Sequence, residues 1–134
     1  RGGGESVAKA ILDARDNLYL QIARSIEDDI LCGALKEEEP VPSTNQFAQF
    51  YSINPATAAK GVNLLVDEGT VYKKRGIGMF VAPGAVRAVQ QKRRQAFWRE
   101  TLPLLLSEAE RLGISREQLL EHIRRTETTR GDDA

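Results

Sequence analysis

The residues from Asn54 to Lys60 combine side chains that suit binding to nucleic acid rather than catalysis. Asn54 and Thr57 can hydrogen-bond to base edges or phosphates, and Ala56 can pack against a thymine methyl group. Lys60 lies one helical turn further along, where a cation would reach a flanking phosphate. Because Pro55 is also small, a DNA duplex would be able to approach this segment closely.

A second basic segment follows at residues 73–78. Lys73, Lys74 and Arg75 precede Gly76-Ile77-Gly78, whose glycines let the backbone approach a sugar-phosphate edge or enter a minor groove. A nucleotide-binding loop is the competing interpretation of this glycine pair. We set it aside because the segment lies between two expected strands, rather than between a strand and a helix, and lacks the third glycine.

Residue sets for catalysis or metal binding are missing from the sequence. The acidic run Glu37-Glu38-Glu39 is interpreted as solvated, and no activated nucleophile or paired carboxylate accompanies it. His122 has no cysteine or second histidine at ligand spacing, so we expect no metal and no cofactor. We expect Cys32, the single cysteine, to be buried and inert. The sequence therefore predicts a protein that is not an enzyme.

Two predicted helices position the first polar segment from its N-terminal side. Apolar residues recur every four positions from Leu18 to Ile30, which predicts an amphipathic helix over residues 18–32 that ends at Gly33. Residues 36–42 contain two prolines and are expected to form a solvated connection. Ser43-Thr44-Asn45-Gln46 fits a capping box, which predicts a helix over residues 44–51 whose first N–H groups can hold a phosphate.

A third helix and a hairpin complete the predicted domain. Asn54 is a suitable N-cap and Pro55 a suitable first residue, which predicts a helix from about residue 56 to 68. Short strand-like runs at 71–74 and 79–81 predict a β-hairpin with a basic tip. The aromatic residues Phe47, Tyr51, Tyr72 and Phe80 are expected to pack in the core or on the hairpin rather than to stack on bases. Three helices followed by a hairpin are typical of a winged helix-turn-helix.

The C-terminal part is predicted to be helical and to pair two subunits. Residues 85–112 form a long helical stretch that Pro103 should kink or break, and Ser115 should cap a last helix. Folding back onto the same chain is the alternative to pairing. Lys92, Arg93 and Arg94 either extend the DNA-binding surface or, as we favour, form a solvated face. The expected interface residues are Phe97, Trp98, Leu102, Leu105, Ala109, Leu112, Leu119, Leu120 and Ile123.

The overall charge gives no indication of a polyanionic partner, since 19 basic residues balance 19 acidic ones in 134. The acids cluster in the first helix, in the 36–42 connection and at the end of the third helix, so the proposed DNA face keeps its cations. No apolar stretch approaches the roughly 18 residues that a membrane span needs. We therefore expect a cytoplasmic protein without a membrane anchor, and we expect Arg1-Gly2-Gly3-Gly4 to be foreign to the natural chain.

The amino-acid sequences of several segments resemble those of the GntR family of bacterial repressors. They are Leu18-Tyr19-Leu20-Gln21-Ile22, Val41-Pro42-Ser43, Ile53-Asn54-Pro55-Ala56-Thr57-Ala58-Ala59-Lys60, Asp67-Glu68-Gly69 and Arg75-Gly76-Ile77-Gly78-Met79-Phe80-Val81. Phe97-Trp98 and Leu102-Pro103-Leu104-Leu105 are similar to the YtrA subfamily, which lacks large effector domains. Many members of the family have an arginine that reads a base where this chain has Asn45, so we do not carry that contact over to this chain. Asn45 is expected to touch phosphate, to read a different base, or to do neither.

Together these observations predict a mainly α (α+β) protein with an N-terminal arm at 1–17, a winged helix-turn-helix at 18–83, and dimerisation helices with a polar tail at 84–134. The resemblance implies a homodimeric repressor of a palindromic operator on double-stranded DNA. A protein-interaction module is the alternative. An effector of unknown identity, if one acts, would bind between the C-terminal helices or at their junction with the winged helix. The residues expected to contact DNA are Ser43, Thr44, Asn45, Gln46, Asn54, Pro55, Ala56, Thr57, Lys60, Lys73, Lys74, Arg75, Gly76, Ile77 and Gly78.

Overall fold

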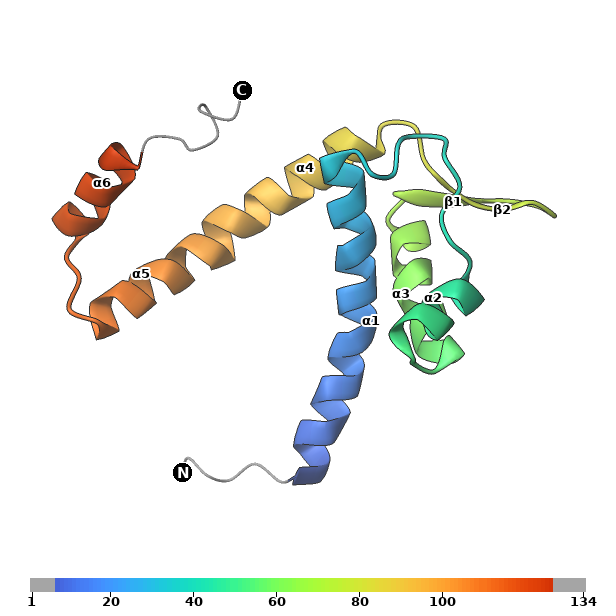
Figure 1. Ribbon diagram of the computed structural model, residues 1–134, viewed down its shortest axis with the longest axis horizontal. Coiled ribbons are helices and arrows are strands. Elements are labelled where there is room, and N and C mark those ends of the chain that lie inside the picture. The colour runs from blue at the N-terminus through green and yellow to red at the C-terminus, as the bar shows by residue number, and fades with distance from the viewer. Residues whose placement is uncertain (1–6, 127–134) are drawn as a thin grey trace. The chain divides into compact units, whose positions relative to one another are not determined.

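The computed structural model describes residues 7–126, with the side chains of 17–126 (Figure 1). The elements are α1 (Val7–Cys32), α2 (Thr44–Tyr51), α3 (Pro55–Asp67), β1 (Val71–Lys74), β2 (Gly78–Val81), α4 (Ala85–Ala96), the π-helical turn η1 (Phe97–Thr101), α5 (Leu102–Arg111) and α6 (Arg116–Arg125). This order confirms the predicted mainly helical fold with a hairpin after the third helix. The chain divides into a first unit that ends at Lys92 and a second that begins at Arg93.

Helix α1 differs from its prediction at its start and agrees with it at its end. It begins at Val7 rather than at Leu18, because residues 7–17 contain good helix formers and no glycine or proline. It ends as expected, with Gly33 at a φ of +87°. Cys32, predicted to be buried, is exposed, since the core-facing residue of this last turn is Ile30. Residues 1–4, expected to be foreign to the natural chain, lie outside the described residues.

The core of the first unit forms where α1 packs against α3. Ile22, Ile26 and Ile30 are buried on α1, and they join Val62 and Leu65 of α3 in one apolar cluster. Gly61 makes this approach close. A Cβ atom at that position would lie 2.7 Å from the carbonyl oxygen of Tyr19, so only glycine fits there without a shift of the helices.

The β-hairpin has the predicted turn and an unpredicted third segment. Strands β1 and β2 pair antiparallel, with Val71 opposite Val81 and Lys74 opposite Gly78. On the other side of β2, the N–H of Val41 donates to the carbonyl of Met79 at 2.8 Å, and Pro40 forms a β-bridge with Phe80. The 36–42 connection was predicted to be merely solvated, but it also pairs with β2. Its prolines prevent a helix but are compatible with an extended edge segment.

The three consecutive glutamates are exposed or half-buried, but each accepts a hydrogen bond. The Glu37 carboxylate accepts from the backbone N–H groups of Gly84 at 2.9 Å and Val86 at 3.3 Å, at the start of α4. Glu38 accepts from the Tyr72 hydroxyl at 2.5 Å. Glu37 and Glu38 are exposed, in agreement with the interpretation of a solvated run, and the N–H groups at the N-terminus of α4 additionally attract the Glu37 carboxylate.

Lys92 ties α4 to two earlier helices of the first unit. Its Nζ atom lies 2.5 Å from Oε2 of Glu27 on α1 and 2.9 Å from Oε1 of Glu68 after α3. The Glu27 side chain is only 5% exposed, and a buried carboxylate requires such a partner. Partial burial of Lys92 opposes its charge, but the hydrogen bonds to Glu27 and Glu68 outweigh it and raise its pKa. Lys92 is exposed, as predicted, but it also pairs with two acidic residues, which the prediction did not include.

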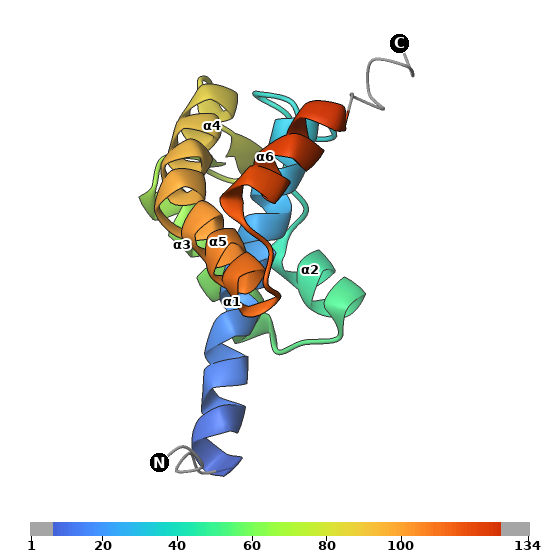
Figure 2. The same ribbon diagram turned by 90° about the vertical axis from the view of Figure 1, so that its left-hand side faces the viewer.

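The second unit contains the predicted interruption, in the form of a π-helical turn. Pro103 has no N–H and its ring clashes with the carbonyl four residues earlier, so the regular hydrogen-bond ladder cannot pass it. The N–H of Leu102 bonds instead to the carbonyl of Phe97, five residues earlier. Figure 2 shows α6 turning back from the end of α5. Ser115 caps α6, as predicted, in a capping box with Gln118.

The second unit has almost no core of its own. Ala109 is its one buried residue in the part that the structure describes. No helix among residues 7–126 is long and apolar enough to cross a membrane.

Candidate nucleic-acid interface

The N-terminus of α2 is held by the predicted capping box. The Ser43 hydroxyl accepts from the N–H of Gln46 at 3.1 Å, and the Gln46 side-chain carbonyl accepts from the N–H of Ser43 at 2.7 Å. The Asn45 side chain is exposed and Thr44 is half-buried. The first N–H groups of the helix have no intrahelical acceptor, so this end can accept a phosphate oxygen.

The start of α3 lies at the protein surface, as the predicted recognition role requires. Asn54, Pro55 and Ala56 are exposed and Thr57 is half-buried. The side-chain oxygen of Asn54 accepts from the N–H of Ala56 at 2.7 Å. Asn54 therefore caps α3 with its oxygen and has only its amide NH₂ group left to donate to a base.

Lys60 lies one turn further along α3, and an aromatic ring positions it. Its Nζ atom is 4.1 Å from the ring centroid of Tyr19 on α1, a cation–π contact. The sequence analysis did not predict this role of Tyr19. A glycine inside a helical pattern can mark close packing, so Gly61 was the available signal that α1 passes next to Lys60.

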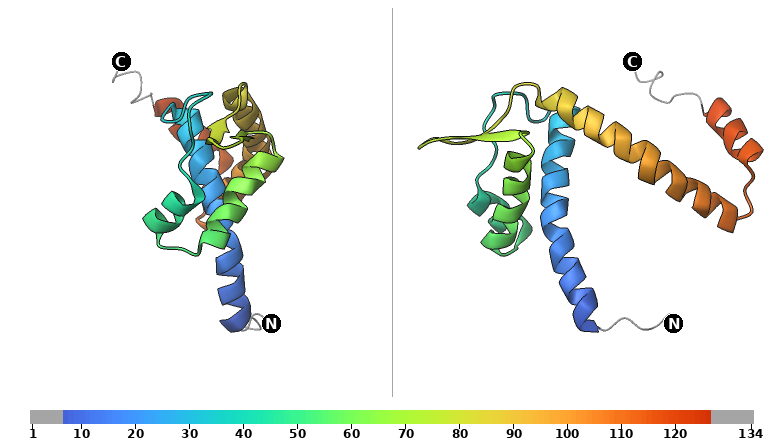
Figure 3. Two further views of the ribbon diagram at one scale, coloured as in Figure 1. Left: turned by 90° about the vertical axis from the view of Figure 1, so that its right-hand side faces the viewer. Right: turned by 180° about the vertical axis from the view of Figure 1, so that it is seen from behind.

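The hairpin places its basic residues and its tip in solvent. Lys73, Lys74 and Arg75 are exposed, and Ile77 is 72% exposed at the tip. Gly76 and Gly78 adopt positive φ angles of 76° and 140°, which confirms that glycines make the reversal. The hairpin projects past α3 on the side opposite α1 (Figures 1 and 3).

The positive charge of this surface is not neutralised by the protein itself. Within residues 17–126, the side chains of Lys60, Lys73, Lys74 and Arg75 form no ion pair with an acid. Lys74 instead lies over the Phe80 ring, 4.3 Å from its centroid. Glu37 and Glu38 of the 36–42 connection accept hydrogen bonds from Gly84 and Tyr72 and not from these cations. The cations therefore remain available for phosphates.

The aromatic residues of α2 are only partly in the core. Phe47 is buried as expected, but Tyr51 is 42% exposed and its hydroxyl lies 3.1 Å from the Ser25 hydroxyl. Phe50 is 78% exposed and contacts Tyr51 edge-on. The sequence pattern assigned no role to Phe50.

The residues of the second unit that were predicted to pair two subunits fall into two groups that differ in exposure. Ala109 is buried and Leu102 and Leu119 are half-buried, so these three pack within the chain. The others are exposed, between 46% for Phe97 and 65% for Ile123, and Phe97 contacts Trp98 edge-on. Leu104, which the prediction omitted, is 70% exposed.

Metal sites have no candidates in the part of the chain that is described. No group of three or more histidine, cysteine, aspartate or glutamate side chains there could hold a metal ion, and His122 is exposed.

Comparisons with known proteins agree with this arrangement. Residues 18–81 match the model of the bacterial regulatory proteins of the gntR family. The crystal structure of a GntR-family protein from Bacteroides thetaiotaomicron aligns with a TM-score of 0.62 and 35% identity, over 82% of this chain and 99% of that one. The HTH-type transcriptional regulator YhcF of Bacillus subtilis is 28% identical over 80% of this chain and 87% of its own length.

Other relatives are longer than this chain. The HTH-type transcriptional repressor NagR of Bacillus subtilis is 32% identical over 74 residues, which are 54% of this chain but only 30% of NagR. The matched family is one of transcription regulators and not of enzymes. The family model, the full-length match in the Bacteroides structure and the winged helix-turn-helix geometry together establish that the chain belongs to the GntR family of helix-turn-helix transcription regulators.

Proposed function

We propose that this protein is a cytoplasmic repressor that binds a palindromic operator as a homodimer. The observation that carries the proposal is the exposed start of α3, at Asn54, Pro55 and Ala56, together with a projecting hairpin whose cations have no acidic partner in the described chain. The exposed N-terminus of α3 and the cations without an acidic partner are together suited to double-stranded DNA, which is a polyanion with a groove wide enough for a helix.

In the proposed complex, α3 enters the major groove by its N-terminal turn. The Asn54 amide and the Thr57 hydroxyl donate to base edges, and Ala56 packs against a thymine methyl. Lys60 contacts a phosphate beside the groove, from a position that the Tyr19 ring fixes. The α2 N-terminus at residues 43–46 holds a second phosphate.

The hairpin grips the flank of the same site. Lys73, Lys74 and Arg75 contact phosphates, and Gly76-Ile77-Gly78 approaches the minor groove. Gly76 and Gly78 adopt their positive φ angles without strain and carry no side chains, so Ile77 is the side chain that the tip exposes between them.

Pairing of two chains through the second unit supplies the second recognition helix. A segment that buries only Ala109 cannot stabilise its own fold, because it removes too little apolar surface from water. Helical geometry places Leu104, Leu105 and Leu112 together on one side of α5, opposite the side that faces α6. We assign this outer face, with Phe97 and Trp98, to the dimer interface. A two-fold dimer presents two α3 helices to half-sites about one helical turn apart.

The finer classification rests on the relatives. NagR is named as a repressor, which favours repression over activation here. The similarity to YhcF extends through 87% of its length, which favours a YtrA-like protein.

Selection of bound fragments from random DNA by the full chain tests the proposal. We expect enrichment of one inverted repeat. Affinity for that repeat should fall steeply with salt, by about 0.9 log unit per log unit of salt for each neutralised phosphate. Lys74→Ala should reduce this slope by about one phosphate, whereas Arg125→Ala, which removes a cation paired with Glu121, should leave it unchanged. A chain that enriches no repeat, or binds DNA without salt dependence, would instead be a protein-docking winged helix.

A further inference from the structure

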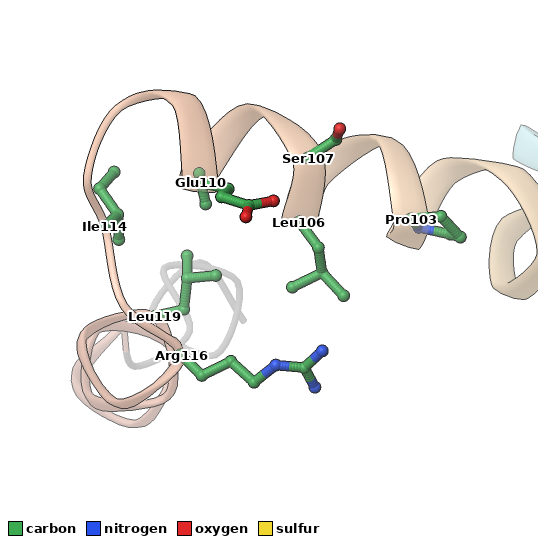
Figure 4. Close-up of a pocket in the computed structure, with 8 residues that line it drawn as sticks. Pro103, Leu106, Ser107, Glu110, Ile114, Arg116 and Leu119 are labelled. Atoms are coloured by element: carbon green, nitrogen blue, oxygen red, sulfur yellow. The ribbon is translucent and has the colours of Figure 1, made fainter.

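A candidate second site lies on the inner side of the α5–α6 hairpin. A groove of about 510 Å³ lies there, a volume within the range of small-molecule sites. Its lining residues are Pro103, Leu106, Ser107, Ala109, Glu110, Ile114, Arg116 and Leu119 (Figure 4). The walls are mostly apolar, with Ala109 at the buried position, so the groove is suited to an apolar body.

One cation and one carboxylate face this groove. Figure 4 shows the Arg116 side chain extending from α6 beneath Leu106, and the Glu110 carboxylate on the α5 wall. Neither residue forms an ion pair within residues 17–126, although nearby Arg111 pairs with Glu108 at 2.6 Å. The guanidinium of Arg116 is therefore available to a ligand.

The position of Arg116 strengthens the preference for an anion. It is the first residue of α6, directly after the cap Ser115, so its charge adds to the positive end of the helix dipole. An arginine fork binds a carboxylate through two parallel hydrogen bonds. Glu110 lies across from it, and its charge opposes ligands that carry more than one negative charge.

We propose that this groove binds a small amphipathic monocarboxylate. Its carboxylate lies on Arg116, and its aliphatic or aromatic body lies on Leu106, Ile114 and Leu119. Ser107 offers one further hydroxyl on the α5 wall.

This groove and the proposed dimer interface occupy opposite sides of α5. At 100° per residue, Leu106 and Glu110 point to one side of the helix, and Leu105 and Leu112 point to the other. Their exposure agrees with this division, since Leu106 is half-buried whereas Leu105 and Leu112 are 49% and 64% exposed. A second chain on the outer face would leave the groove open, which is why we commit to a small ligand rather than to a partner helix.

Calorimetric titration of the full chain with octanoate, octanol and octylamine, without DNA, tests the inference. Octanoate should bind at least about tenfold more tightly than octylamine, because only the carboxylate can use Arg116. Arg116→Gln should weaken octanoate about tenfold. Glu110→Gln should tighten it severalfold by removing a repulsion. Arg125→Gln, on the same helix but outside the groove, should change nothing. All three side chains are exposed, so circular dichroism should report an unchanged fold.

The inference is overturned if octanoate and octylamine bind equally, or if Arg116→Gln leaves octanoate affinity intact. It is also overturned if octanoate does not bind while Leu106→Asn or Leu119→Asn dissociates the dimer in sedimentation, since a second chain would then occupy the groove. Because no DNA enters these titrations, their result is independent of whether operator binding is found.

Discussion

Lys92 and Glu27 are 65 positions apart in the sequence, yet the ammonium of one lies 2.5 Å from the carboxylate of the other. Glu27 is inside the first unit, with a side chain 5% exposed, whereas Lys92 is 47% exposed at the end of that unit. The pair joins α4 to α1, and Glu68 joins α3 to the same ammonium. The last residue of the first unit is thus joined to two earlier helices of that unit.

Replacing Lys92 by methionine should lower the free energy of unfolding of the full chain by about 1–2 kcal/mol. Breaking a fully buried pair costs about 3–5 kcal/mol, and the half-exposed lysine reduces this through solvent screening. Urea denaturation measures the change. In the double variant Lys92→Met/Glu27→Gln the two losses should not add, because both substitutions break the same ion pair. A double variant that is less stable by the sum of both losses would contradict this account.

The same lysine should make stability sensitive to alkaline pH. Its folded-state pKa is raised above the usual value of about 10.5, so the folded protein holds this proton more strongly than the unfolded chain does. The contribution is therefore complete below about pH 10.5 and is lost as the pH rises through the folded-state value. The hydrogen bond to Glu38, with desolvation and the Glu38 charge, raises the pKa of Tyr72 as well, so that group acts in the same direction.

Unfolding measurements between pH 9 and 11.5 on Lys92→Met and Tyr72→Phe separate the two groups. The free energy of unfolding of the unsubstituted chain should decline as the pH rises, and we expect each substitution to remove part of this decline. A decline that neither substitution changes would exclude both groups as its source.

Gly61→Ala should destabilise the protein by about 2 kcal/mol, although alanine ordinarily favours a helix over glycine by up to about 1 kcal/mol. The reason is the 2.7 Å approach of the new Cβ to the Tyr19 carbonyl oxygen, which would push α1 and α3 apart. Thermal or urea unfolding gives the value. Asn63→Ala, at an exposed position of the same helix, is the matched control and should be neutral or slightly stabilising. If both alanines stabilise alike, the two helices are not in close contact at Gly61.

Asn54→Ser should separate capping from base recognition. Serine keeps an oxygen that can accept from the Ala56 N–H, so the free energy of unfolding should stay within about 0.5 kcal/mol. It loses the amide NH₂ group, so preference at one base pair should relax by about 1–3 kcal/mol. Competition binding with single-base operator variants measures this. Asn54→Ala should lose both stability and preference, and an unchanged preference in Asn54→Ser would remove Asn54 from the base-reading residues.

Trp98→Glu should produce a monomer and weaken operator binding. Trp98 is 61% exposed and contacts Phe97 edge-on, so the charge would enter the proposed interface without disturbing a core. Sedimentation velocity measures the oligomeric state. Gln91→Glu, an exposed position on α4, adds the same charge outside that interface and should remain dimeric. A Trp98→Glu chain that still sediments as a dimer would refute this interface.

The elements that the sequence predicted well are those whose signals are local. The bounds of α2 follow from Ser43 and Gln46, three residues apart, and the structure confirms Thr44–Tyr51. Asn54 and Pro55 likewise mark the start of α3. The α1 start was missed although Val7, Ile11 and Ala14 continue the helical spacing of apolar residues up to Leu18, and although the propensity of residues 7–17 also favours a helix.

What the sequence could not predict are contacts between distant segments. Glu37 was assigned to solvent, yet it meets the N-terminus of α4 across 47 positions. Lys92 and Glu27 show the same limit, because a period of 3.6 residues says which face is apolar but not which acid lies opposite a given lysine. At the candidate DNA surface, residue types, exposure and the Asn54 cap were predictable, whereas the placement of Tyr19 under Lys60 depended on packing.

The hairpin also has a bearing on solubility. Segment 38–41 covers the outer side of β2, so the unpaired edge of this small sheet is that of β1, and it carries Lys73 and Lys74. An unprotected edge invites strands of other chains to add to it and so to aggregate, and lysine is a common means of preventing this. The charges proposed to hold DNA would then also keep neighbouring molecules apart, and neutralising both lysines should make the purified protein more prone to precipitate.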